Sequence, residues 1–232
     1  MREEIEWFCR HGVSDIAVLD PIFNANQAHA AWVLEELSRN DYAGRLSLQC
    51  RAEFVTDEFI AAAQRLDVRL EFGLQTIHRS EGNAVRRLNN LARVSKALDS
   101  ARRAGLAHEV SLIFGLPGQT LASFEASVDW CLEHNVPVLK AFPLLLLRGT
   151  ELELERERWG LRLDARSTMP MVVSSNTFAR REWQQMQRLS EALRRTEGAH
   201  PTSVDALRRI ADASLPDASR WSPTTSGEAR AQ

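Results

Sequence analysis

The sequence predicts an α/β fold built around a parallel β-sheet, and two features of the chain support this prediction. Over the first 160 residues, short apolar runs alternate with longer segments of helical periodicity. The runs are nearly continuous in Val, Ile, Leu and Phe, which is typical of parallel strands that are buried on both faces. Such alternation indicates right-handed βαβ units. The five predicted strands are 15–20, 45–50, 68–74, 108–116 and 137–147.

The segments between these runs have the residue spacing of amphipathic helices. Thr56 and Thr120 stand where a helix N-cap is expected, and Gly12 and Gly105 stand where a helix ends. The predicted helices are 2–12, 26–41, 56–66, 91–105 and 120–135.

The pattern changes after the fifth run. We expect a charged helix over 151–161, a strand or extended segment over 171–179 and a helix over 180–195. From residue 200 the composition turns to Ser, Pro, Thr, Ala and Arg, which predicts disorder. The predicted organisation is therefore a main domain over 1–161, an extension over 162–199 and a tail over 200–232.

Composition limits the class of protein. The chain has 232 residues, an apolar share of 44% and a net charge of −2, which is typical of a globular domain without a clear nucleic-acid surface. It contains no run of about 18 apolar residues and no secretion signal at its start, so we expect no membrane segment and a cytoplasmic location. Cys9, Cys50 and Cys131 lie too far apart to suggest a metal site or a disulfide framework.

Ligands of parallel α/β sheets bind where the strands end. After the first strand, Asp20 and Asn24 either present oxygen atoms to an ammonium group or only shape a turn. After the second, Gln49, Arg51 and Glu53 share one face of an extended segment. They either line a polar interior or form an ion pair at the rim.

The third and fourth strand ends give stronger signals. Glu71 and Gln75 interrupt a strand otherwise built for burial, and their side chains suit a sugar hydroxyl or a nucleobase edge. The alternative is a glutamine that is satisfied by the neighbouring backbone. Next comes Gly-Leu-Pro-Gly at 115–118, where Gly115 and Gly118 permit close approach of a ligand to the backbone, or simply form a tight turn into the next helix.

Taken in order, these strand ends resemble the radical S-adenosylmethionine (radical SAM) superfamily, in particular its methylthiotransferase and cobalamin-dependent branch. The matching stretches are "LDPIFNAN", "LEFGLQTIHRSEGNAVRRLNN", "SLIFGLPGQT" and "FPLLLLRGTELELERERWGL", in residues 1 to 161. The resemblance implies a partial (β/α)6 TIM-like barrel that lacks its first strand, followed by a carboxyl-terminal helical extension.

The resemblance also assigns roles to residues of this chain. The loop Asp20, Pro21 to Phe23 would meet the methionine amino group of S-adenosylmethionine, and Glu71 and Gln75 would face the ribose. The strand and glycine loop would lie beside the adenine. The predicted cofactor-binding residues are Asp20, Pro21, Phe23, Arg51, Glu71, Gln75, Ile113, Gly115, Leu116, Pro117 and Gly118.

The sequence departs from the family pattern in three places. The signature Cys-x3-Cys-x2-Cys, whose thiolates hold a [4Fe–4S] cluster, is absent, so we expect no metal ligands in this chain. Asn89-Asn90 stand where an Asn-Arg pair is common, which leaves Arg86, Arg87 or Arg93 to reach the cofactor carboxylate. Gln119 replaces a common acid.

Three hypotheses of function follow. In the first, the chain is part of a longer radical SAM enzyme that uses the cluster, with or without cobalamin, to cleave S-adenosylmethionine and abstract hydrogen from an unknown small-molecule or peptide substrate; the chain alone would then be inactive. In the second, it is a degenerate barrel that binds an adenosyl ligand or a protein partner. In the third, it is an ordinary enzyme that uses Glu71, His78 or His108 as acid or base.

Overall fold

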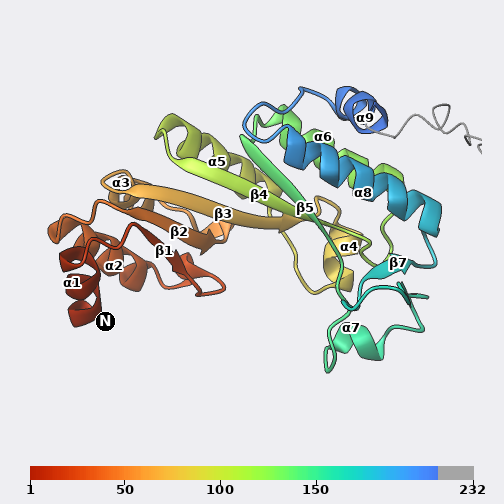
Figure 1. Ribbon diagram of the computed structural model, residues 1–232, viewed down its shortest axis with the longest axis horizontal. Coiled ribbons are helices and arrows are strands. Elements are labelled where there is room, and N and C mark those ends of the chain that lie inside the picture. Colours follow the sequence, from red (N-terminus) through yellow and green to blue (C-terminus); the bar gives the residue numbers. More distant parts are fainter. Residues whose placement is uncertain (214–232) are drawn as a thin grey trace, which may run out of the picture.

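The computed structural model describes residues 1–213 and contains the predicted parallel sheet (Figure 1). Its strands pair in parallel in the order β1-β2-β3-β4-β5. The α/β fold class is therefore confirmed, and each strand lies within a few residues of the run that predicted it. The strands are β1 (Asp15–Val18), β2 (Arg45–Cys50), β3 (Asp67–Gln75), β4 (Ala107–Phe114) and β5 (Val138–Pro143).

Helices occupy the segments between the strands. The side chains of Asn26, Thr56, Asn90 and Thr120 each accept a hydrogen bond from a backbone N–H in the first turn of the helix that follows. These caps fix where the chain leaves each loop. The helices are α1 (Arg2–Arg10), α2 (Gln27–Arg39), α3 (Asp57–Ala63), α4 (Arg79–Ala84), α5 (Leu91–Arg103) and α6 (Leu121–Glu133).

The strand order has a consequence for the layers. Each strand is added beside the previous one, so every right-handed crossover advances in the same direction and places its helix on the same face. A doubly wound sheet would instead reverse direction and carry helices on both faces. The arrangement is consistent with a partial barrel.

The helix-covered face of the sheet is apolar apart from the buried His108. Along β3 buried residues alternate with half-buried ones, and the buried ones, such as Leu70 and Phe72, belong to the main core. The expectation of burial on both faces is therefore wrong for this sheet. We call the other face the open face; it carries Gln49, Glu71, Gly73, Gln75, Glu109, Ser111, Lys140 and Phe142.

The segment after β5 differs in part from the sequence prediction. Only α7 (Glu151–Leu154) is helical in the stretch expected to form a charged helix over 151–161. Glutamates recur four residues apart there, as at Glu151 and Glu155, and such like-charge pairs destabilise a helix. The strand expected over 171–179 is reduced to β7 (Val172–Ser174), which pairs with β6 (Arg162–Leu163).

Helix α8 (Arg180–Arg195) matches the prediction and packs on β5 and α6. Its Trp183 ring lies 5.8 Å from that of Phe114, which in turn lies 5.8 Å from Phe124 of α6. These three buried rings join sheet and helices into one core.

Disorder from residue 200 onward is contradicted by α9 (Val204–Asp212). Ser203 caps this helix, and its buried Leu207 and Ala211 belong to the core. Arg208 binds the carboxylate of Glu125 on α6, with Nε 2.8 Å from Oε1. The remaining part of the predicted tail, 214–232, lies outside the described residues.

The two edges of the sheet differ. The backbone N–H of Leu139 in β5 donates to Nε2 of His200 at 2.9 Å, and Nδ1 of that imidazole lies 2.8 Å from Oγ1 of Thr196. Further along this edge, Leu145 forms an antiparallel bridge with Met171. On the opposite edge, β1 pairs with β2 alone among the described strands.

Candidate functional site

The open face contains a cavity of 390 Å³ at the carboxyl-terminal half of the sheet. Its lining combines side chains from four strands, which the parallel register brings to one level: Glu71 neighbours Glu109, and Ser111 neighbours both Gly73 and Lys140. We call it the open-face cavity. Of the predicted site residues, Pro21, Glu71 and Gln75 line it.

Gln75 ends β3 in an unusual conformation. The register between β3 and β4 shifts between Gly73 and Gln75, and Gln75 has φ of 61°, in the left-handed region that costs a non-glycine residue about 1 kcal/mol. Its side chain folds back over Gly73, where an added Cβ would lie 2.6 Å from Nε2 of Gln75. Oε1 of Gln75 is buried and has no hydrogen-bond partner within residues 1–213.

Arg87 meets Gln75 over the same glycine. One terminal nitrogen of its guanidinium donates to the carbonyl oxygen of Gly73 at 2.8 Å, while its buried Nε has no partner among the described residues. Burial, with a contribution from the nearby charge of Arg51, lowers the pKa of Arg87. Gln75 and Arg87 thus leave one acceptor and one donor unsatisfied at the same place, a feature typical of a ligand site.

The structure also distinguishes the three arginines proposed for the cofactor carboxylate. Arg86 forms an exposed ion pair with Glu151. Arg93 lines other cavities, next to α3 and α4. Arg87 is the one that lines the open-face cavity.

A second cavity of 700 Å³ adjoins the first, and Gln75 and Arg87 line both. Its wall is largely apolar and includes Ile113 of β4 and Leu116 of the glycine loop, two of the predicted site residues. We call it the apolar cavity. Val85 is also part of this wall. Further apolar side chains come from the chain after β5, namely Leu144, Leu145, Leu147, Leu152 and Trp159.

The glycine loop acts differently from the expectation of bare backbone. Gly115 and Gly118 have φ of 89° and 76°, which explains why glycine is needed there. The backbone N–H groups of Gly115 and Leu116, however, both donate to Oε1 of Gln119, at 2.7 and 3.2 Å. Pro117 and Gly118 line neither cavity. Leu116 borders the apolar cavity but is fully buried, and Gln119 occupies the amides of Gly115 and Leu116, so the loop does not present free backbone amides there.

Gln119 belongs to a buried network that sequence reasoning missed. Its Nε2 lies 3.3 Å from Oε2 of Glu81, which also accepts a 2.5 Å hydrogen bond from Oγ1 of Thr76. The network joins the glycine loop to α4 and to the residue after Gln75. It thereby fixes the two strand ends that border the apolar cavity. The departure at Gln119 was visible in the sequence, but its partners were not.

The loop after β1 is only partly at the site. Phe23 is buried, and its ring lies 6.4 Å from that of Phe59, so its assignment to the cofactor is corrected to a core role. Asn24, also buried, exchanges two 2.9 Å hydrogen bonds with the backbone of Arg51, which favours the turn-shaping alternative. Asp20 is exposed and lines neither cavity, and only Pro21 reaches the open-face cavity.

Arg51 is not brought to the same place as Gln75. Its guanidinium binds Glu53 at 3.2 Å and the carbonyl oxygen of Leu88 at 2.9 Å, the rim ion pair that was one of the two alternatives. The histidines also lie elsewhere. His78 has Nε2 3.0 Å from the carbonyl oxygen of Ser123, and His108 is buried on the helix-covered face. Neither lines the two cavities.

The cysteines do not fit an iron–sulfur cluster. Cys9 lies on α1, Cys50 ends β2 and Cys131 lies on α6. Burial raises the pKa of the Cys50 thiol to about 12 and raises that of Cys131 as well, which disfavours thiolates. Within residues 1–213, no three His, Cys, Asp or Glu side chains converge as a metal site would need.

A model of the radical SAM superfamily matches residues 1–131, more than half of the 232 residues. The chain belongs to the radical SAM superfamily. This membership supports an enzyme domain over the degenerate barrel. No helix of residues 1–213 has the length and apolar character to cross a membrane.

Sequence relatives match only in part. An uncharacterized protein of Methanocaldococcus jannaschii is 22% identical over 116 residues, which are 50% of this chain and 34% of that protein. Protein YhcC of Escherichia coli strain K12 is 32% identical over 87 residues, 38% of this chain and 28% of that protein. The matches thus span about a third of these relatives.

Two solved structures share the fold. The methyltransferase TsrM of Kitasatospora setae, solved with tryptophan substrate and the analog aza-SAM, gives a TM-score of 0.60 at 22% identity over 66% of this chain and 31% of that chain. Elp3 of Methanocaldococcus infernus gives 0.52 at 19% identity over 68% and 44% of the two chains.

Proposed function

We propose that this chain forms the S-adenosylmethionine-binding part of a radical SAM enzyme and holds the cofactor across the two adjoining cavities. The observation that carries the proposal is the unsatisfied pair at their junction, Oε1 of Gln75 and Nε of Arg87. Leaving such groups buried without partners costs about 1–3 kcal/mol each, which a ligand that pairs with them recovers.

Each part of the cofactor has a suitable environment. The apolar cavity, with Ile113 and Leu116 in its wall, suits the adenine ring. Gln75 and Glu71 present oxygen atoms that can accept hydrogen bonds from the ribose hydroxyls. Arg87 provides a charged donor for the methionine carboxylate.

When bound, S-adenosylmethionine would supply an adenosyl group on a sulfonium that can be cleaved by one-electron reduction. The three cysteines of the chain do not fit an iron–sulfur cluster, so we assign its residues to cofactor binding and orientation alone. The substrate and the location of the enzyme in the cell stay predictions.

The cobalamin-dependent branch also stays a prediction. Its support is the fold likeness to TsrM, which has also been solved with cobalamin and a [4Fe-4S] cluster bound, at a TM-score of 0.61 and 20% identity. A saturable change in the visible spectrum of hydroxocobalamin on titration with the chain would support it. A spectrum identical to that of free hydroxocobalamin would contradict it.

Calorimetric titration with S-adenosylmethionine tests the proposed function. Arg87→Met removes a charged hydrogen bond of about 1.5–3 kcal/mol, so we expect binding to weaken by roughly 10- to 100-fold. Arg93→Met is the matched control, because Arg93 lines neither cavity, and its affinity should stay within about twofold. Equal losses in the two variants, or no binding to the unmodified chain, would contradict the proposal.

A further inference from the structure

The open-face cavity contains an ion pair, Lys140–Glu109, that has no role in the proposed cofactor binding. We call the part of the cavity around this pair its lower part, and the part around Gln75 and Arg87 its upper part. Nζ of Lys140 lies 2.9 and 2.7 Å from the two carboxylate oxygens of Glu109. The Glu109 side chain is only 7% exposed, whereas that of Lys140 is 35% exposed. An ammonium group has three N–H donors, so one donor of Lys140 remains after Glu109 has taken two.

The choice of lysine is itself informative. Of 29 basic residues only Lys96 and Lys140 are lysines, and all others are arginines. Lys96 is exposed on α5, whereas Lys140 lies inside the open-face cavity. A compact ammonium therefore stands where this chain otherwise uses guanidinium groups, and the two differ in the ligands they accept.

Two neighbours of Lys140 line the same cavity and have side chains that can contact a ligand. Ser111 sits beside Lys140 in the register of β4 and β5, and its hydroxyl forms no hydrogen bond within residues 1–213. Phe142 follows on the same face of β5, and it is 52% exposed although it is a large apolar side chain. Two donors and an apolar ring thus face the same space.

We propose that Lys140, Ser111 and Phe142 form a substrate subsite for an organic carboxylate with an apolar body. The carboxylate accepts hydrogen bonds from Lys140 and Ser111, and the apolar body packs on the ring of Phe142. Glu109 holds the ammonium in place. The inference rests on the proposed function in one respect, since it assigns the upper part of the cavity to the cofactor.

The local charge decides between a monoanion and a dianion. The charged side chains that line the cavity are Glu71, Glu109, Lys140 and Arg87, and together they carry no net charge. Bound S-adenosylmethionine adds a net charge of +1. One carboxylate balances this charge, whereas a phosphate dianion would leave an excess negative charge beside the two glutamates. The carboxylate should accordingly bind more tightly when the cofactor is present.

Because the chain has only two lysines, amine labelling tests the subsite directly. The full chain is acetylated with an N-hydroxysuccinimide ester, with and without S-adenosylmethionine, and each lysine is followed by mass spectrometry. We expect saturating phenylacetate to slow acetylation of Lys140 at least fivefold, more so with the cofactor, and to leave Lys96 unchanged. Ser111→Ala and Phe142→Ala should each reduce the protection to less than twofold.

Two further probes define the outcomes that overturn the proposal. Equal protection by inorganic phosphate would show that the ligand needs no apolar body. Stronger protection by benzyltrimethylammonium would show that the subsite binds cations instead of carboxylates. Lack of protection by phenylacetate rejects the subsite. Line broadening of phenylacetate in NMR should also disappear in the double variant Lys140→Gln/Glu109→Gln, which removes both charges together and leaves no buried charge unpaired.

Calorimetry on the same preparations separates this proposal from the proposed function. Variants at Ser111 and Phe142 should bind S-adenosylmethionine within about twofold of the unmodified chain. Protection of Lys140 without cofactor binding would support the subsite and reject the proposed function. Cofactor binding without protection of Lys140 would support the proposed function and reject the subsite.

Discussion

Gly73→Ala tests the arrangement of the cofactor site more sharply than removal of any single contact. The added Cβ would lie 2.6 Å from Nε2 of Gln75 and 3.3 Å from a terminal nitrogen of Arg87. Both atoms are the ends of flexible side chains, so the contacts are relieved when these side chains swing away. The fold should tolerate the change, because alanine in a strand is intrinsically no worse than glycine.

The expected loss falls on ligand binding. A displaced Gln75 forfeits a neutral hydrogen bond of about 1 kcal/mol, and a displaced Arg87 forfeits a charged one of about 1.5 kcal/mol or more. The sum of roughly 2.5 kcal/mol corresponds to a 60-fold weaker affinity for S-adenosylmethionine. Calorimetry measures this affinity, and urea unfolding should show a free energy of unfolding within about 1 kcal/mol of the unmodified chain.

A double-mutant cycle completes the test. If Gly73→Ala acts by displacing Gln75, then adding it to Gln75→Ala should cost less than it does alone. Unchanged affinity in Gly73→Ala, with the methyl group accommodated, would refute the claim that these side chains hold the cofactor. Full additivity in the cycle would refute the route through Gln75.

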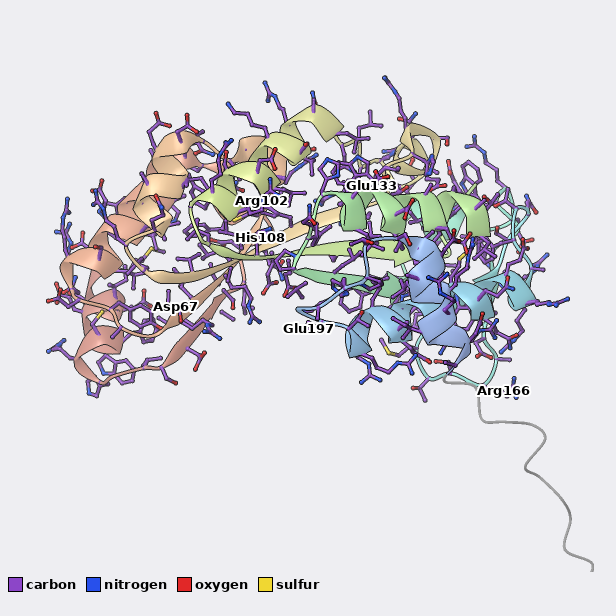
Figure 2. All side chains as sticks on the ribbon, turned by 90° about the horizontal axis from the view of Figure 1, so that it is seen from above. Asp67, Arg102, His108, Glu133, Arg166 and Glu197 are labelled. Atoms are coloured by element: carbon purple, nitrogen blue, oxygen red, sulfur yellow. The ribbon has the colours of Figure 1, made fainter. Side chains whose placement is uncertain are left out.

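Three further predictions concern stability and are checked by urea unfolding. Phe114→Ala removes the ring between α6 and α8 and should lower the free energy of unfolding by about 3–5 kcal/mol; a loss below 1 kcal/mol would contradict the packing. Burial lowers the pKa of His108, which Figure 2 shows near Arg102, so the unfolded chain binds a proton more readily. Stability should hold above pH 6.5 and fall as the pH drops below it, less steeply in His108→Gln; equal slopes would exclude this histidine. Arg208→Ala leaves the largely buried Glu125 without its partner and should lower the free energy of unfolding by about 1–2 kcal/mol, a small value because Arg208 is half exposed. Amide exchange in α9 should also become faster; unchanged exchange would contradict the docking of α9 on α6 through this pair.

The sequence predicted most of the sheet because burial against the helices imposes continuous apolar runs. Strand β2 was predicted with its observed bounds, and β3 within a residue at each end. What the runs concealed was the polarity of the open face. Lys140 lies between Val138 and Phe142, so the run was still nearly continuous in apolar residues, even though all three side chains belong to the less buried face.

The candidate site was predictable only for residues whose place at a strand end can be inferred from the sequence around them. Glu71, Gln75 and Ile113 were proposed from the strand ends, and each lines one of the two cavities. Arg87, by contrast, could not be distinguished from Arg86 and Arg93 until the loop was placed. Phe23 was misassigned because an apolar ring in a loop looks the same in sequence whether it meets a ligand or the core.

Longer-range features were missed for a related reason. The partners of Gln119 come from α4 and from the end of β3, and sequence spacing carries no information about such meetings. Helix α9 was missed because disorder was predicted from the composition of the whole tail, although Val204, Leu207 and Ala211 have helical spacing.

The contact between His200 and β5 limits where the sheet of residues 1–213 can be extended. An exposed strand edge recruits the edge of another molecule, and a sheet open on both sides can grow without limit. Here one side is closed by the imidazole of His200 and by the Leu145–Met171 bridge, while the outer side of β1 has no paired strand among the described residues. Within residues 1–213, pairing with a strand of another molecule is therefore restricted at the β5 edge, and the sheet can be extended only beside β1.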